Sequence, residues 1–217
     1  MVLPAAGVLT AAALSPEQAV RIAGLMAGSV SLVVAGLVRE RGRRLQPGLW
    51  KSWGGSSTVR RLRWRDATSP GVVARLHTRV NPLLDEALPD AQNEASDPEE
   101  ADRRYNEAVA VLRERTRDQA RFPLVFAENV EYGFRRNMLG VRSIGLAVSS
   151  LSMVASLIVL VGLVDGGDHA AWTISLVASA VVGLVWWRLV TPEWVRRASD
   201  LYTDRLFEAV ESLHERR

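Results

Sequence analysis

The sequence predicts an all-α membrane protein with three transmembrane helices and a small helical domain between the first two. Two apolar stretches, 144–164 and 170–190, are each long enough to cross the hydrocarbon of a bilayer, and neither contains a charged residue before Arg188. Only 165–169 separates them, so we expect a membrane hairpin with a tight outer turn. Lipid offers the backbone no hydrogen bonds, which makes helices the expected form of both spans. Arginines gathered beside the spans are the second observation.

Composition excludes several classes of chemistry. The 217 residues carry a net charge of +3 and include no cysteine, so the chain has no disulfide, thiolate metal site or thiol nucleophile. His77, His169 and His214 are far apart in the chain, and we expect no metal site and no cofactor. No nucleophile-elbow pattern or specific carboxylate pair is present, so we expect no catalytic residue and no enzyme.

The first span is predicted at 16–38. Ser15, Pro16 and Glu17 form a helix start, with a cap, a proline at the first position and an acid in the first turn. The uncharged stretch 22–38 is near the lower length limit for a span, and a buried helix of a soluble domain is the alternative. We interpret 1–15 as an outer-face segment or a misassigned start, because it lacks the basic start of a secretory signal.

Charge orients the predicted spans. Basic residues mark the cytoplasmic ends of transmembrane helices, whereas the turn 165–169 carries acids and no lysine or arginine. The flanking basic residues are Arg39, Arg41, Arg43, Arg44, Arg135, Arg136, Arg142, Arg188, Arg196 and Arg197. All flanks agree on an N-out, C-in topology that places the domain 39–143 and the segment 191–217 inside.

The predicted domain consists of a turn-rich section followed by helices. The turn-rich section covers 46–69, and a helix after Ser69 should break at Asn81-Pro82. The polar stretch 89–96 is interpreted as a loop, and Asp97 should cap the next helix.

A further helix begins at Phe122-Pro123 and carries an apolar stripe at four-residue steps. It should lead almost without interruption into the second span, with Gly133 and Gly140 as bending points. We therefore interpret it as a coupling helix between domain and membrane. Its stripe is Phe126, Val130, Phe134 and Met138.

The amphipathic segment 191–217 starts a last helix at Thr191-Pro192. Its apolar spacing is close to a heptad repeat, so it could form a short coiled coil. Packing on its own domain is the favoured alternative.

A basic, tryptophan-containing section is the candidate anion or ligand contact. Arginine binds phosphate in a bidentate manner, tryptophan offers a stacking face, and glycine allows close approach of backbone N–H groups. The section matches no phosphate-binding loop. The favoured interpretation is that these arginines orient the protein in the membrane and contact lipid headgroups. A nucleotide-type small ligand is the second alternative, and nucleic acid is disfavoured. The candidates are Trp50, Trp53, Gly54, Gly55, Arg60, Arg61, Arg63 and Arg65.

Small residues recur at helical spacing in all three spans and would let helices approach closely. Some could serve packing within one chain and the rest self-association, so we expect a homo-oligomer. The spans contain no internal ionisable group, which disfavours an ion-coupled transporter. The candidate packing residues are Gly24, Gly28, Ser152, Ser156, Ser175, Ser179 and Gly183.

Three strings carry a resemblance to known proteins. Residues 49–58 (LWKSWGGSST), 62–66 (LRWRD) and 128–140 (ENVEYGFRRNMLG) resemble a family of small, largely uncharacterised bacterial multi-span membrane proteins. The resemblance covers mainly 49–145, and it implies a bacterial inner-membrane location. The architecture more loosely resembles membrane effectors of bacterial antiphage signalling systems, in which a cytoplasmic signal drives membrane-protein assembly and loss of membrane integrity.

The leading functional hypothesis is a non-enzymatic membrane effector or sensor whose cytoplasmic domain receives a ligand or protein partner and alters transmembrane assembly. The alternative is a scaffold that recruits a cytoplasmic partner through its domain and C-terminal helix. A membrane-bound enzyme acting on lipids or nucleotides is the least favoured class.

Overall fold

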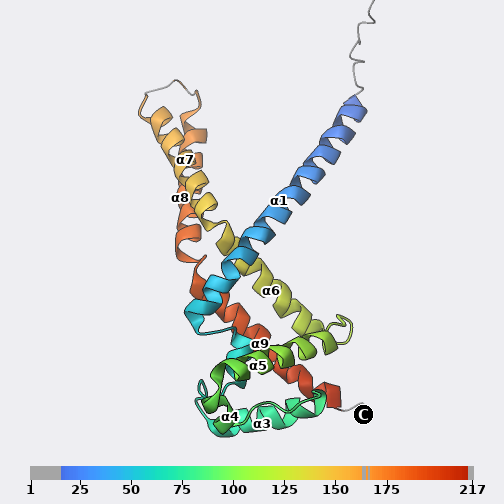
Figure 1. Ribbon diagram of the computed structural model, residues 1–217. Helices are drawn as coiled ribbons and strands as arrows, with labels where there is room; N and C mark the ends of the chain where they lie inside the picture. Colours follow the sequence, from blue (N-terminus) through green and yellow to red (C-terminus); the bar gives the residue numbers. More distant parts are fainter. Residues whose placement is uncertain (1–15, 163–164, 166, 215–217) are drawn as a thin grey trace, which may run out of the picture. The chain divides into compact units, whose positions relative to one another are not determined.

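The computed structural model is all-helical, as the sequence predicts (Figure 1). It describes the backbone of residues 16–162, 165 and 167–214, and side chains from residue 31 to residue 213 within these ranges; every regular element there is a helix. The chain divides into two compact units, 1–37 and 38–217. The predicted outer segment 1–15 lies outside the described residues.

Helix α1, Pro16–Trp53, includes the first predicted span and extends well beyond it. The side chains of Gly24 and Gly28 lie outside the described residues. The turn-rich section predicted from residue 46 is wrong at its start, because α1 continues through Pro47 to Trp53. The helix ends where Gly54 and Gly55 adopt φ values of 79° and 135°, a region open to glycine, and Gly55 N donates to Trp50 O over 2.7 Å.

Four α-helices and a 3₁₀ turn build the lower part of the domain. They are α2 (Ser57–Leu62), α3 (Pro70–Val80), the 3₁₀ turn η1 (Asn81–Leu83), α4 (Ala91–Ser96) and α5 (Pro98–Arg115). Among them, α2, α4 and α5 begin at side-chain caps. The break predicted at Asn81-Pro82 is the junction of α3 with η1. Asp97 accepts from Glu100 N at the predicted start of α5. The loop predicted for 89–96 is wrong over its last six residues, because Asp90 caps α4 there.

Helices α6 (Pro123–Gly140) and α9 (Pro192–His214) pack side by side along the domain (Figure 1). The apolar face of α9 is buried against its own domain, which is the favoured of the two alternatives for this segment. We use the name helical domain for residues 38–141 and 192–214. Its core is lined by Leu62, Val80, Tyr105, Leu112, Tyr202, Leu206 and Val210.

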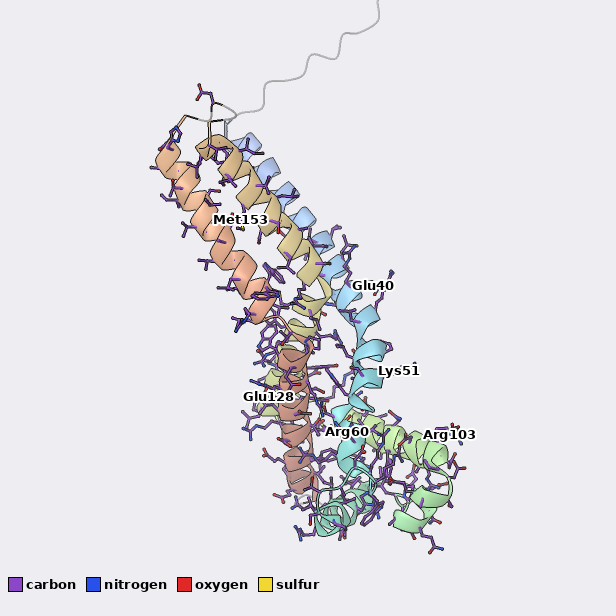
Figure 2. The ribbon with its side chains drawn as sticks, turned by 90° about the vertical axis from the view of Figure 1, so that its left-hand side faces the viewer. Glu40, Lys51, Arg60, Arg103, Glu128 and Met153 are labelled. Carbon is purple, nitrogen blue, oxygen red and sulfur yellow. The ribbon has the colours of Figure 1, made fainter. Side chains whose placement is uncertain are left out.

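Helices α7 (Arg142–Leu160) and α8 (His169–Arg188) form a pair that is long and apolar enough to cross a membrane. The α7–α8 pair is shifted slightly from the predicted spans 144–164 and 170–190. His169 belongs to α8 and not to the predicted turn, because Asp168 caps the helix by accepting from the N–H groups of Ala170 and Ala171. Figure 2 shows side chains projecting from both helices, with Met153 labelled on α7.

The predicted small residues of α7 and α8 meet between these two helices. Ser152 Oγ accepts from Ser179 Oγ over 2.7 Å, and Ser156 Oγ donates to Ser175 Oγ over 3.1 Å. A Cβ at Gly183 would lie 3.4 Å from Ser149 Cβ. These serines and this glycine therefore serve packing within one chain.

The other end of the α7–α8 pair is fixed by larger side chains. Gly145 lies under the ring of Trp186, where an added Cβ would be 2.2 Å from the indole. Arg142 donates to Trp186 O and Trp187 O, so the first residue of α7 caps the last turn of α8.

Candidate ligand-binding cleft

The arginines predicted to contact an anion are paired inside the helical domain. Arg60 lies 3.4 Å from Asp66, and Arg61 pairs with Asp204. Arg63 and Arg65 share the carboxylate of Asp102. Arg60, Arg61 and Arg63 line one pocket of about 290 Å³, but Asp66 and Asp200 line it with them. The ion pair of Arg61 links α2 to α9, and those of Arg63 and Arg65 link the segment after α2 to α5.

The most buried of these ion pairs form a paired arginine cluster, which consists of Arg63, Arg65, Glu94, Asp102 and Tyr105. Arg63 Nε and Nη2 each donate to an Asp102 oxygen over 2.8 Å, and Arg63 is only 7% exposed. Arg65 Nη2 donates to both Asp102 oxygens over 2.7 Å. Arg63 thus holds the carboxylate in the bidentate geometry that arginine favours, while a single nitrogen of Arg65 contacts both oxygens.

Glu94 is the buried acid of this cluster. Its carboxylate accepts from Trp64 N over 2.8 Å, Arg65 N over 3.0 Å and Tyr105 Oη over 2.6 Å. Burial alone would raise the pKa of Glu94, but these hydrogen bonds and the charge of Arg65 outweigh burial and lower it. Burial and the bond to Glu94 raise the pKa of Tyr105. Every charge in the cluster is therefore satisfied by a partner.

The predicted aromatic and glycine candidates separate from one another. Trp53 is buried in a small core with Leu49 and Tyr132. Gly54 O accepts from Arg63, and a Cβ at Gly55 would lie 2.9 Å from the Arg63 guanidinium. Of the whole predicted set, only Trp50 lines the large cleft of the domain.

That cleft has a volume of about 890 Å³ and lies among α1, α5, α6, α9 and the start of α2. No carboxylate lines it among the residues that the structure describes. Within the described residues, Arg117 is the one arginine of the cleft that has an ion pair; it lies 3.8 Å from the exposed Glu114. The lining arginines are Arg39, Arg43, Arg113, Arg117 and Arg136. This surface is positive and lacks acids, in contrast to the paired arginine cluster.

Three buried polar atoms without a hydrogen-bond partner belong to this cleft. Across the described residues, the buried side-chain nitrogen and oxygen atoms that lack a partner are Trp50 Nε1, Tyr132 Oη and Arg136 Nε. All three residues line the cleft. Buried polar groups are nearly always paired, and each unpaired donor costs about 1–3 kcal/mol. Their concentration in one place indicates a site that is incomplete without an acceptor.

Arg136 occupies a central position in the cleft. Its Nη1 donates to Gln46 Oε1 on α1, its Nη2 donates to Asn137 Oδ1 over 3.2 Å, and its Cζ lies 5.7 Å from the Tyr132 ring centroid. Burial lowers the pKa of Arg136, and the like charge of Arg43 adds to this effect. Burial raises the pKa of Tyr132 more than its interaction with Trp50 and the charges of Arg136 and Arg113 lower it, so the hydroxyl stays protonated.

Three of the four residues of the predicted coupling stripe of α6, all except Met138, line the same cleft. Phe126, Val130 and Phe134 are 41%, 53% and 51% exposed, whereas Met138 is half-buried. The buried residues of α6 are instead Val125 and Tyr132. The stripe is therefore an open apolar side of the cleft and does not pack in the core.

Beside the cleft, α1 and α6 cross with their backbones in contact. A Cβ at Gly42 would lie 2.3 Å from Asn137 Oδ1 and 2.7 Å from Asn137 Cα. A Cβ at Gly140 would lie 2.7 Å from Gly42 N. Of the two predicted bending points, Gly133 lies within continuous helix, and Gly140 is the last residue of α6.

Sequence reasoning missed most of the cleft. Arg39 and Arg43 are four residues apart in α1 and share one face of that helix, whereas Arg113 lies in the last turn of α5 and Arg117 just after its end. That spacing was the available signal, but it could not show that two distant helices face the same cavity. No family model matches the chain, and no curated protein or solved structure shows significant similarity to it.

Proposed function

We propose that this protein is a non-enzymatic sensor or effector of a bacterial inner membrane, which receives an anionic ligand in the cleft and passes the change to its membrane helices. The observation that carries the proposal is the position of α6. This helix forms one side of the cleft, and only Val141 separates its last residue from the first residue of α7. A change in α6 would therefore act directly on a helix suited to lie in lipid.

A membrane position is supported by the surface of the α7–α8 pair. Leu151 and Ile174 are each 69% exposed, and α8 has no buried residue. Exposing this apolar surface to water would cost free energy, whereas exposing it to lipid would not. Together with the charge bias of the sequence, this supports three spans, an N-out, C-in orientation and a cytoplasmic helical domain.

Transmission is supported by the contacts that link the elements. Arg39 and Arg43 on α1 and Arg136 on α6 line one cleft, so a bound anion would attract both helices. The glycine contact of Gly42 with Gly140 provides a close crossing about which they could rotate. Arg142 holds the end of α8, so α7 and α8 would move together. A ligand changes such an equilibrium only through its different affinity for the two arrangements.

The test uses the absence of native cysteine. A single Ile174→Cys substitution on the exposed face of α8 allows copies to be cross-linked in intact cells. We expect cross-linked oligomers and loss of membrane potential on overproduction, and both should decrease with Arg136→Gln. The matched control is Arg103→Gln, which changes an exposed arginine of α5 outside the cleft (Figure 2). A monomer in detergent, with cells unaffected by overproduction, would contradict the proposal.

The scaffold alternative loses one of its predicted surfaces. Val195, Leu206 and Val210 of α9 are fully buried in the helical domain and cannot also hold a partner, whereas Leu201 on the same helix is 45% exposed. Removing this helix would open the core, so its deletion would not distinguish recruitment from unfolding.

A further inference from the structure

We infer that the cleft binds a phosphate ester, with the phosphate among Arg39, Arg43 and Arg136 and an apolar or planar body on the exposed side chains of α6. The inference rests on the proposed function and assigns a chemical class to its ligand. Three features support it: uncompensated charge, unpaired donors and an apolar side of matching size.

The charge of the cleft favours a ligand with more than one negative charge. Five arginines line it without a carboxylate among the described residues, and the like charge of Arg43 adds to the burial that lowers the pKa of Arg136. A monoanion would leave most of this repulsion in place. Phosphate monoesters and diphosphates carry two or more charges near neutral pH, and their geometry suits the planar guanidinium group.

The unpaired donors favour phosphate over carboxylate. Trp50 Nε1, Tyr132 Oη and Arg136 Nε each need an acceptor. A terminal phosphate offers three acceptor oxygens, whereas a carboxylate offers two. The three atoms are covered by their neighbours, so the lining must adjust for a ligand to reach them. Binding would then remove the cost of the unpaired donors and favour the adjusted arrangement.

The apolar side of the cleft indicates that the phosphate is attached to a larger body. Phe126, Val130 and Phe134 follow one face of α6 and remain exposed. Aromatic faces bind planar rings by stacking and acyl or glycerol groups by apolar contact. The volume of about 890 Å³ is within the range of small-molecule sites and exceeds what inorganic phosphate needs.

This chemistry has two possible sources, a soluble nucleotide-type ester or the headgroup of an anionic phospholipid. The experiment uses the full chain in nanodiscs and measures the thermal unfolding midpoint. In phosphatidylcholine nanodiscs the soluble probes are adenosine diphosphate, pyrophosphate and citrate. In the second arm phosphatidic acid, a lipid with a terminal phosphate monoester, replaces part of the phosphatidylcholine, without a soluble probe.

We expect a saturable rise of the midpoint with adenosine diphosphate, and a smaller rise with pyrophosphate and citrate, if the ester is soluble. A rise only with phosphatidic acid assigns the site to the lipid headgroup. In either arm, Arg43→Gln should weaken the apparent affinity about tenfold, because a charge-assisted hydrogen bond is lost, whereas Arg103→Gln should not.

Tyr132→Phe separates binding from folding. This change removes an unpaired buried hydroxyl, so the midpoint without ligand should stay unchanged or rise, while the ligand-dependent rise decreases. A purely structural hydroxyl would give the opposite sign without ligand.

Two results would overturn the inference: no rise in either arm, or equal losses with Arg43→Gln and Arg103→Gln. Neither result would decide the proposed function, because the cross-linking and membrane-potential experiments test that function independently of the ligand. Conversely, normal binding without any change in cross-linking would overturn the proposed function and leave the ligand class in place.

Discussion

Two groups of arginines in the helical domain differ in their partners. In the paired arginine cluster, Arg63 and Arg65 contact the carboxylates of Glu94 and Asp102. In the cleft, Arg39, Arg43 and Arg136 have no carboxylate partner among the described residues, and unpaired donors lie beside them. Both regions contain more than one arginine. The presence or absence of a matching acid is what distinguishes arginines that stabilise the fold from arginines available to a ligand.

The largest expected effect concerns the buried acid of the paired cluster. Glu94→Ala should lower the free energy of unfolding by about 3–5 kcal/mol, because it leaves Arg65, Tyr105 and two backbone N–H groups without their acceptor. Chemical unfolding of the full chain in detergent, followed by circular dichroism, measures this. Glu94→Gln keeps an acceptor oxygen and should cost less. Equal costs for the two variants would show that the charge and hydrogen bonds of this position matter little.

The second prediction compares the two groups directly. Arg63→Gln should destabilise the helical domain by several kcal/mol, since it breaks the bidentate pair with Asp102 in a buried setting. Arg43→Gln should leave the free energy of unfolding unchanged or raise it, because it removes a repulsion with Arg136. The same unfolding measurement applied to both variants checks the difference. Similar destabilisation by both would remove the distinction drawn above.

The third prediction concerns the close crossing beside the cleft. Gly42→Ala should destabilise by about 1–3 kcal/mol, because the new methyl group would overlap Asn137 and force α1 away from α6. Gly48→Ala is the matched control on the same helix. It has open space around the new methyl group and should be neutral or stabilising by up to about 1 kcal/mol. Thermal unfolding of both variants, together with probe binding, shows whether the crossing shapes the cleft.

The smallest expected effect is a pH dependence from His77. Its ring is buried against Trp64, with Nε2 donating to Leu62 O over 2.7 Å. Burial lowers its pKa more than the Leu62 bond and the charge of Glu94 raise it, so the folded chain holds the neutral ring. The unfolded ring takes up a proton near pH 6.5, and stability should therefore fall as the pH decreases below that value toward the folded pKa.

Unfolding of wild type and His77→Gln between pH 7.5 and pH 5.5, about one unit either side of the usual histidine pKa, measures this effect. We expect the variant to lose most of the slope, whereas His169→Asn should retain it. A variant slope equal to that of wild type would assign the pH dependence to other groups.

Several features followed from the sequence because they depend on neighbours along the chain. The helix start at Asp97, the break at Asn81-Pro82 and the start of α9 at Pro192 each follow from caps and prolines. The two apolar helices followed from length and hydropathy alone. The continuation of α1 through Pro47 did not, because proline and glycine in this section resemble a turn until tertiary contacts favour helix.

The candidate site was only partly predictable. The stripe of Phe126, Val130 and Phe134 was identified, but not that it remains exposed. Trp50 was identified, yet Arg113 and Arg117, which line the same cleft, come from the end of α5 and the segment after it. Periodicity shows which residues share a face of a helix, but it does not show which other residues that face contacts.

By itself, the sequence determined the all-helical class, the two apolar helices and the positions of most helix ends, since these depend on local propensity and hydropathy. Only the tertiary structure decided which arginines form ion pairs with an acid and which line a cavity. Pairing of charges joins residues far apart in the chain, such as Arg63 with Asp102, and depends on how helices pack. The same packing left Trp50, Tyr132 and Arg136 with donors that have no partner in the described part of the chain.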